Sequence, residues 1–90
     1  MNIRQDSFFR RSYKRLHDNQ REIVNKAIRQ IAVDPEIGAQ KKMDLSGVRV
    51  WKFPVLDQQY LLGYAFENET LFLLALSVHE NFYRDLKKKK

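Results

Sequence analysis

One stretch near the C-terminus decides the fold, and it reads Leu71-Phe72-Leu73-Leu74-Ala75-Leu76-Ser77-Val78-His79-Glu80-Asn81-Phe82-Tyr83. Its first part is almost continuously apolar, which is typical of a strand buried on both faces in the middle of a sheet. The chain then becomes polar within two residues. Side chains at the end of a central strand are held rigidly, so this polar cluster is either a ligand site or the start of a helix.

Upstream of this strand, the pattern first predicts a helix with a basic outer face. Phe9, Tyr13 and Leu16 recur at helical spacing, and Ser7 is the expected N-cap. Residues 3–9 are interpreted either as a short edge strand or as an irregular lead-in. The basic side chains that lie off the apolar stripe are Arg10, Arg11, Lys14 and Arg15.

A second amphipathic helix follows directly. Asn19 and Glu22 resemble a capping box at its start, and Asp34 before Pro35 ends it. His17 is expected either in the turn between the two helices or at the C-terminal end of the first, where it suits the helix dipole. The apolar stripe of the second helix consists of Ile23, Val24, Ala27, Ile28, Ile31 and Ala32.

The remaining sequence predicts strands. Residues 35–47 are expected to form a long connector, and Asn81–Leu86 a short terminal helix. Short turns between consecutive strands imply antiparallel neighbours. We therefore predict an α+β fold in the order β-α-α-β-β-β-α, with a helical hairpin packed on one face of a small, mostly antiparallel sheet. The predicted strands are 48–55, 60–66 and 70–78, with turns at 57–59 and 67–69.

Composition narrows the class of protein. A length of 90 residues predicts one domain, 1–90, whose last four residues form a basic tail at 87–90. The formal net charge of +6, from 17 Lys and Arg against 11 Asp and Glu, favours a polyanionic partner, either nucleic acid or an acidic protein. The chain has no cysteine for disulfides or thiolate metal sites. With no signal peptide or membrane-spanning segment expected, the predicted location is cytoplasmic.

Three segments carry a resemblance to a known family. They are Asp44-Leu45-Ser46-Gly47-Val48-Arg49-Val50, Leu61-Leu62-Gly63-Tyr64, and the strand that ends in His79-Glu80-Asn81-Phe82-Tyr83. Their order and spacing resemble the RelE/ParE superfamily of bacterial type II toxin–antitoxin toxins. The resemblance covers Phe9 to Leu86 and implies a toxin that is neutralised by a cognate acidic antitoxin in a hetero-oligomer. In that superfamily, RelE-like members cut mRNA on the ribosome, whereas ParE-like members poison DNA gyrase without nuclease residues.

The match to the RelE-like nucleases is partial. Arg49 and Lys52 stand where that branch has basic residues on the first strand after the connector, and Tyr83 fits its C-terminal tyrosine. The branch has an arginine on the next strand, where this chain has Leu61-Leu62, and another after the last strand, where it has His79-Glu80. A RelE-type site would therefore lack two of its arginines.

A second nuclease branch, the YafQ-like toxins, matches at other positions. It ends its last strand in a histidine with an aromatic residue four positions on, as His79 and Tyr83 do, and it has an aspartate near Asp57. Its other histidine falls near Lys52. The resemblance thus implies Lys52, Asp57, His79 and Tyr83 as catalytic residues. Arg49, Arg84, Arg11, Lys14 and Arg15 are the candidates for RNA binding.

These residue types suit metal-independent cleavage of RNA by its own 2′-hydroxyl. Histidine is the natural acid or base near neutral pH, and Lys52 or Arg49 would stabilise the charged phosphorane. Tyr83 would stack on a base or donate a proton. The substrate supplies the nucleophile, so neither a metal nor another cofactor is required.

Each candidate also has a structural interpretation. His79 is alternatively a capping or packing residue, and Tyr83 one that packs on the sheet. Arg49 and Lys52 are three apart on one strand and should point to opposite faces, so one of them is expected to be structural or to contact a partner protein. The aromatic residues Trp51, Phe53 and Tyr60 form either an exposed strip that an antitoxin covers or part of an ordinary core.

Three functions remain open at this point. The first is a toxin that blocks translation as a ribosome-dependent endoribonuclease, with ribosome and mRNA as partners. The second is a ParE-like toxin that inhibits DNA gyrase and is not a nuclease. The third is a plain basic binding domain that only pairs with RNA or with an antitoxin.

Overall fold

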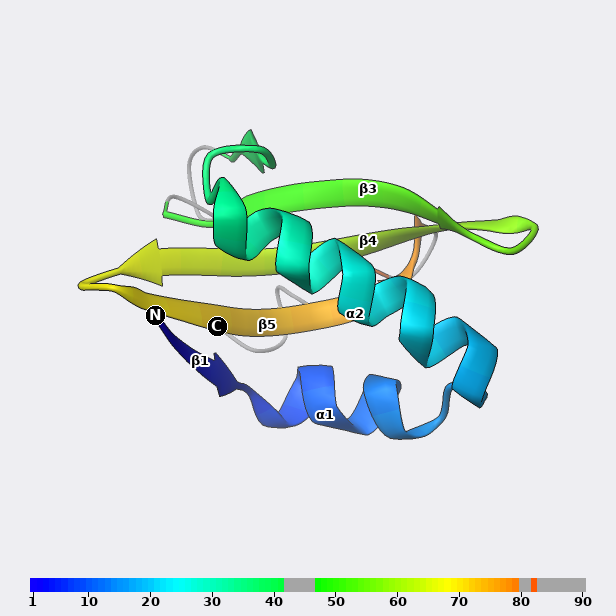
Figure 1. Cartoon of the computed structure of the whole chain (residues 1–90). Helices are drawn as coiled ribbons and strands as arrows, with labels where there is room; N and C mark the ends of the chain where they lie inside the picture. Colours follow the sequence, from blue (N-terminus) through cyan, green and yellow to red (C-terminus); the bar gives the residue numbers. More distant parts are fainter. Residues whose placement is uncertain (42–46, 80–81, 83–90) are drawn as a thin grey trace.

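The computed structural model describes residues 1–41, 47–79 and 82, and shows helices on a five-stranded sheet (Figure 1). The predicted α+β class and the order of its two consecutive helices are confirmed. The predicted terminal helix at 81–86 lies outside the described residues apart from Phe82. The elements are β1 (Asn2–Gln5), α1 (Ser7–Lys14), α2 (Asp18–Val33), β2 (Ala39–Gln40), β3 (Arg49–Val55), β4 (Gln58–Glu67) and β5 (Thr70–Val78).

The sheet has the order β1-β5-β4-β3-β2, so β5 has a strand on each side, as its apolar sequence predicts. The pairs β2–β3, β3–β4 and β4–β5 are antiparallel. The pair β1–β5 is parallel, with Ile3 opposite Leu71, which decides for an edge strand at the N-terminus. The connector predicted at 35–47 is wrong in one respect, because it contains β2.

Tight turns set the antiparallel register. Leu56 and Asp57 connect β3 to β4, and Asn68 and Glu69 connect β4 to β5. Asn68 and Glu69 both have positive φ, 52° and 60°, the backbone that two-residue hairpins require. The turn predicted at 57–59 therefore begins one residue too late, and the turn predicted at 67–69 begins one residue too early.

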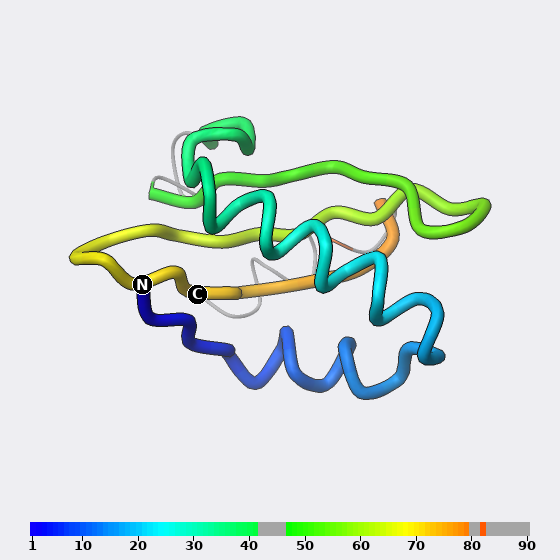
Figure 2. The backbone as a smooth tube through the Cα atoms, in the orientation of Figure 1, coloured from blue at the N-terminus to red at the C-terminus, as the bar shows by residue number. Residues whose placement is uncertain are grey.

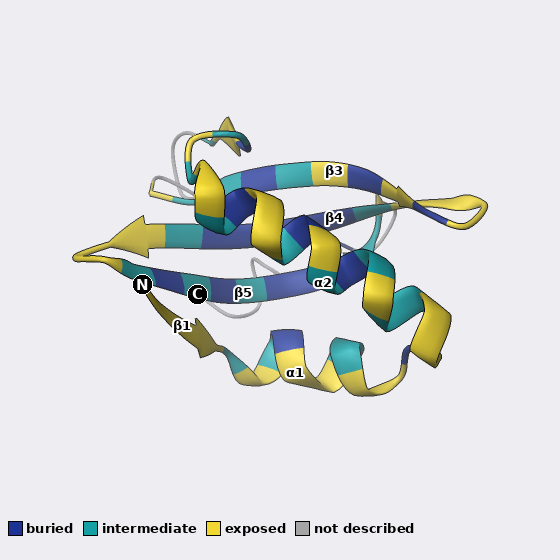
Figure 3. Ribbon diagram, in the orientation of Figure 1, coloured by how far each residue is buried: buried dark blue, intermediate teal, exposed yellow. Residues whose placement is uncertain are grey.

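The main core lies between the helices and one face of the sheet (Figures 1 and 3). Phe53 is buried in it, and Trp51 and Tyr60 pack against it, so the aromatic residues belong to the core and the exposed strip does not form. A fully buried side chain of this kind stabilises the fold by about 1.5–3 kcal/mol. The buried residues are Phe9, Leu16, Val24, Ala27, Ile31, Phe53, Val55, Leu62, Tyr64, Leu71, Leu73 and Leu76.

A smaller cluster lies on the sheet face that the helices leave open. Val50, Leu61 and Ala75 point to this face from three neighbouring strands, and Phe82 is fully buried among them. The chain therefore turns back onto the open face soon after β5.

The helix starts differ from the sequence predictions. Asp6, not Ser7, caps α1, since its Oδ1 accepts a hydrogen bond from the N–H of Phe8 at 3.0 Å. His17 is the N-cap of α2, and the side chain of Gln20 accepts from its N–H at 2.7 Å. The expected Asn19 capping box is wrong, because α2 already begins at Asp18. Of the two alternatives for His17, the helix C-terminus is wrong because α1 ends at Lys14, and the position between the helices is correct.

The path of the backbone places the α1–α2 turn near the end of β5 (Figure 2). Leu16, in that turn, is buried and joins the main core. None of the helices in the described part of the chain is both long and apolar enough to cross a membrane.

Candidate functional site

His79 follows β5 directly and is exposed. It lines a hollow of about 290 Å³ together with Val78 and with Gln58 and Gln59 of β4. The register explains this neighbourhood, because Val78 pairs with Tyr60 and the start of β4 lies beside the end of β5. His79 is therefore presented to solvent on a backbone fixed by the sheet.

Asp57 belongs to the same end of the sheet. It is the second residue of the β3–β4 turn, immediately before Gln58, and it is exposed. Its carboxylate makes no hydrogen bond or ion pair to any other described residue. The structure thus brings Asp57 and His79 to one end of the sheet.

Lys52 is exposed on β3, on the face that the helices leave open. It pairs with Leu61, which in turn pairs with Ser77 on β5. Two strand spacings separate Lys52 from Ser77, or about 10 Å. Lys52 does not line the hollow beside His79. It lies level with Ser77, two residues before His79, on a strand that is separated from β5 by β4.

Arg49 has a different environment, on the helix-covered face. Its Nη1 donates to the carbonyl oxygens of Gly38 at 2.8 Å and of Glu36 at 3.2 Å. The prediction that Arg49 and Lys52 point to opposite faces is confirmed. Arg49 holds the segment after α2 against the sheet, which is the structural role expected for one of the pair.

Tyr64 reinforces this attachment from β4. Its hydroxyl donates to the carbonyl of Pro35 at 2.6 Å and accepts from the N–H of Gly38 at 2.9 Å. Burial raises the pKa of Tyr64, while the hydrogen bond from Gly38 and the charge of Arg49 act in the opposite direction. Tyr64 is fully buried, and both hydrogen bonds of its hydroxyl join β4 to the segment after α2.

The basic residues of α1 form an exposed surface beside the sheet. Arg11, Lys14 and Arg15 are exposed, and none makes an ion pair with another described residue. The Arg11 guanidinium lies 5.8 Å from the centre of the Phe8 ring, a distance at which a cation and a ring attract. Tyr83 and Arg84, the remaining candidates, lie outside the described residues.

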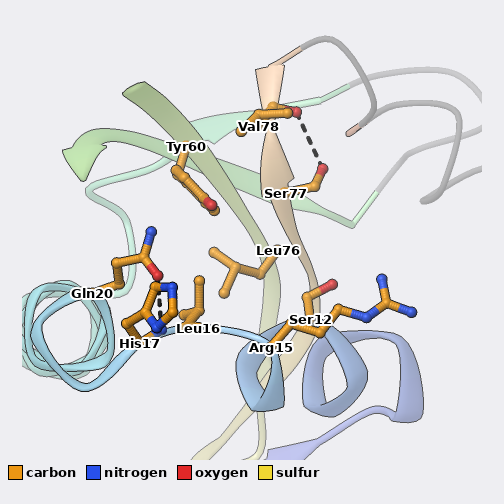
Figure 4. Close-up of a pocket in the computed structure, with 9 residues that line it drawn as sticks. All are labelled: Ser12, Arg15, Leu16, His17, Gln20, Tyr60, Leu76, Ser77 and Val78. Atoms are coloured by element: carbon orange, nitrogen blue, oxygen red, sulfur yellow. Dashed lines mark hydrogen bonds between the residues drawn. The ribbon is translucent and has the colours of Figure 1, made fainter. Parts of the chain in front are cut away.

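The structure also shows a groove that sequence patterns did not reveal (Figure 4). We call it the corner groove, because it lies where the α1–α2 turn meets the ends of β4 and β5. Its volume is about 350 Å³. Side chains of three distant segments form it, so no local motif marks it. Its lining residues are Ser12, Arg15, Leu16, His17, Gln20, Tyr60, Leu76, Ser77 and Val78.

No metal site is formed by the residues that the structure describes. Three or more His, Asp or Glu side chains do not come together anywhere in ranges 1–41 and 47–79. The functional groups of the described residues at this end of the sheet are imidazole, hydroxyl, amide and guanidinium groups and the Asp57 carboxylate. Together such groups can bind anions and transfer protons.

Comparison with known proteins identifies the family. Residues 3–87 match the model of the ParE-like toxin of type II bacterial toxin–antitoxin systems. This chain belongs to that family. The matched residues include both helices and all of the sheet except Asn2, the first residue of β1.

Solved structures agree with the fold of the toxin. A free-state variant of the Escherichia coli toxin RelE with two arginines replaced by alanine has 18% identity and a TM-score of 0.73, over 97% of this chain and 90% of that chain. A chain of the intact E. coli RelBE toxin–antitoxin complex has 18% identity and a TM-score of 0.70, over 84% of this chain and 93% of that chain.

A more distant structural relative comes from Mycobacterium tuberculosis. The complex RelBE2 contains a chain with 16% identity and a TM-score of 0.56, over 87% of this toxin and 90% of that chain. At these identities the likeness concerns the fold alone. No curated protein matches the toxin by sequence.

Proposed function

We propose that the toxin inhibits translation by cutting mRNA on the ribosome, with His79 transferring protons at the scissile phosphate. One observation carries the proposal: His79 is exposed at the rigid end of β5, beside an open hollow. A histidine so placed is accessible to RNA and suited to acid–base work. The resemblance to RelE-like and YafQ-like toxins supports the same activity.

The proposed reaction uses the 2′-hydroxyl of the RNA as nucleophile. The bond from the 2′ oxygen to phosphorus forms while the bond from phosphorus to the 5′ oxygen breaks. One group accepts the 2′ proton and another protonates the leaving 5′ oxygen, and His79 takes one of these roles. Asp57 and Tyr83 are the proposed partners of His79 in this transfer.

Lys52 would stabilise the additional negative charge of the phosphorane. It is exposed and approaches from the open face, whereas His79 lies at the end of β5. The separation of their strands, about 10 Å, leaves room for a phosphate group between the two side chains. Arg49 does not take part, because carbonyl oxygens on the other face already hold its guanidinium.

We infer further that an acidic antitoxin binds the toxin. Apart from the sheet end, the described surface has an apolar hollow of about 460 Å³ at the end of α2, lined by Val33 and Ile37. Val33 is 87% exposed there, and the positive charges of Lys26 and Arg29 outweigh the negative charge of Asp34 among the lining residues. An amphipathic acidic segment would complement both properties. Val33→Asp should then weaken antitoxin binding at least tenfold without weakening the activity of free toxin.

A second function, inhibition of DNA gyrase, is favoured because arginines of the RelE nuclease pattern are missing or are engaged in the fold. Leu61 and Leu62 replace one arginine of the RelE pattern, and Arg49 is engaged in the fold. A ParE-like toxin needs no catalytic residue. Under this alternative His79 would only terminate β5.

The deciding experiment adds purified toxin to a translation extract and maps the mRNA ends by primer extension. The proposal predicts cleavage within ribosome-bound mRNA, which His79→Ala and Tyr83→Ala abolish. Lys52→Gln should slow cleavage strongly, while Arg4→Gln on β1 makes the same charge change far from the site and should leave the rate unaltered. Intact mRNA together with inhibited supercoiling by gyrase would establish the alternative.

A further inference from the structure

The corner groove combines an apolar floor with a polar rim. Leu16 and Leu76 are buried at its base, and Val78 adds a third apolar wall. In Figure 4 the Tyr60 ring lies over one side of the groove and the side chain of Ser12 over the other. A flat aromatic ring above an apolar floor is a surface on which a nucleic-acid base can stack.

The rim has hydrogen-bonding groups that the fold does not use. Gln20 is occupied, since its Oε1 accepts from the N–H of His17 at 2.7 Å. The side chains of Ser12, Arg15 and Tyr60 make no hydrogen bond or ion pair with the other described residues. All three carry donors, so together they are suited to an anionic ligand.

The charge around the groove points to the same ligand class. No carboxylate lines it, and Arg15 contributes a fixed positive charge. Arg11 and Lys14 extend this charge along the outer surface of α1. The nearest acid, Asp18, is already paired with Arg21 at 3.3 Å.

The groove adjoins the proposed catalytic end. Val78 lines both the corner groove and the hollow beside His79. An RNA strand with its scissile phosphate at His79 would reach the groove by passing over Val78. An acidic peptide would also meet the charge of Arg15, but the shared border with the hollow beside His79 favours RNA.

We propose that the corner groove binds one nucleotide of the RNA strand next to the scissile phosphate. Arg15 and Ser12 hold its phosphate, and Tyr60 stacks on its base. The proposal rests on the proposed cleavage of RNA by His79. It adds a subsite on the helix side of the sheet, away from Lys52 on the open face.

The first test measures the binding of a short fluorescent single-stranded RNA to toxin made inactive by His79→Ala. Adding Arg15→Gln should weaken binding about tenfold. Arg10→Gln is the matched control, because Arg10 lies on the same helix, is exposed and does not line the groove. An equal loss in both variants would mean general attraction to RNA and would overturn the subsite.

The second test examines the base and Tyr60. Tyr60→Leu should weaken binding about tenfold, in line with the usual strength of base–aromatic stacking. The difference between this variant and its Tyr60 parent should vanish when the RNA carries an abasic nucleotide in place of the stacked one. Equal discrimination on intact and abasic RNA would overturn the stacking role.

Two outcomes separate this inference from the proposed function. If ribosome-bound mRNA is cleaved and Arg15→Gln leaves KM unchanged, the nuclease function stands and the subsite is wrong. If the toxin cleaves no mRNA but Arg15→Gln still reduces RNA binding selectively, the subsite stands without the nuclease. Unchanged RNA binding with reduced binding of an acidic antitoxin peptide would assign the groove to the peptide and overturn the inference.

Discussion

The hydroxyl of Tyr64 accepts a hydrogen bond from the N–H of Gly38 at 2.9 Å and thereby joins the segment after α2 to the middle of the sheet. The same hydroxyl donates to Pro35, and Arg49 binds the carbonyl of Gly38. Side chains from two strands thus hold one short connector. This arrangement determines where β2 begins.

Removing the hydroxyl should therefore destabilise the toxin. Tyr64→Phe leaves the N–H of Gly38, a buried residue, without its partner, which costs about 1–3 kcal/mol. Urea unfolding followed by circular dichroism measures this loss. Tyr60→Phe is the control, since the Tyr60 hydroxyl has no partner among the described residues, and its effect should stay below about 0.5 kcal/mol.

The same tyrosine predicts a dependence of stability on pH. Burial raises the pKa of Tyr64 above its ordinary value of 10.0, so the folded toxin keeps the proton more tightly than the unfolded chain. The stabilisation is complete below pH 10 and is lost as pH rises through the folded-state pKa. Wild-type toxin should lose more stability than Tyr64→Phe between pH 9 and about 11. Parallel curves for the two proteins would contradict this.

Gly38 should tolerate no side chain. A Cβ at this position would lie 2.7 Å from the Tyr64 hydroxyl and 3.0 Å from the carbonyl oxygen of Val50. We expect Gly38→Ala to cost about 1–3 kcal/mol, through overpacking and loss of the hydrogen bond. Gly47→Ala provides a comparison, because its Cβ meets nothing and only its φ of 87° opposes the change, at about 1–2 kcal/mol. Gly38→Ala should also show the same loss of stability with rising pH as Tyr64→Phe, whereas Gly47→Ala should behave like the wild type.

Substitutions at Arg49 and Lys52 should have opposite effects, because the first should lower stability and the second should lower the proposed activity. Arg49→Met removes two hydrogen bonds to carbonyls and should cost about 1–2 kcal/mol. Under the proposed function, the folded variant should cleave mRNA at the wild-type rate. Lys52→Gln should change stability by less than about 0.5 kcal/mol and slow cleavage about a hundredfold. Unfolding curves and single-turnover cleavage on the same samples test the pair. Cleavage lost in Arg49→Met but retained in Lys52→Gln would reverse the assignment.

The start of α1 gives a test of capping. Asp6→Ala should destabilise the toxin by about 1 kcal/mol, because the Asp6 carboxylate binds the N–H of Phe8. Ser7→Ala should have less than half that effect, since Ser7 is the first residue of the helix and not its cap. Thermal unfolding of the two variants is sufficient to rank them.

Long apolar patterns predicted their elements well. The strand expected at 70–78 is observed as Thr70–Val78. Its nearly continuous apolar run is typical of a strand that is buried on both faces and paired on both sides. The second helix ends as expected at Asp34, where Pro35 restricts the backbone. Such constraints act within a few residues, so the sequence displays them directly.

Features that depend on distant residues were harder to predict. β2 has only two residues, Ala39 and Gln40, and exists because Arg49 and Val50 pair with them. His17 became an N-cap because the preceding helix ended early and Leu16 turned into the core. The corner groove likewise joins side chains that no sequence period connects. At the site, the position of His79 after β5 and the opposite faces of Arg49 and Lys52 followed from local patterns.

The parallel pairing of β1 with β5 has a consequence for how the toxin is made. The first strand to be synthesised has its partner in the last, with Asn2 opposite Thr70. Closing that contact requires almost the whole chain, and the entropy of closing so long a loop opposes it until the intervening strands have paired. His79 lies just beyond the same strand. A nascent chain that still lacks β5 therefore has neither the complete sheet nor the exposed His79.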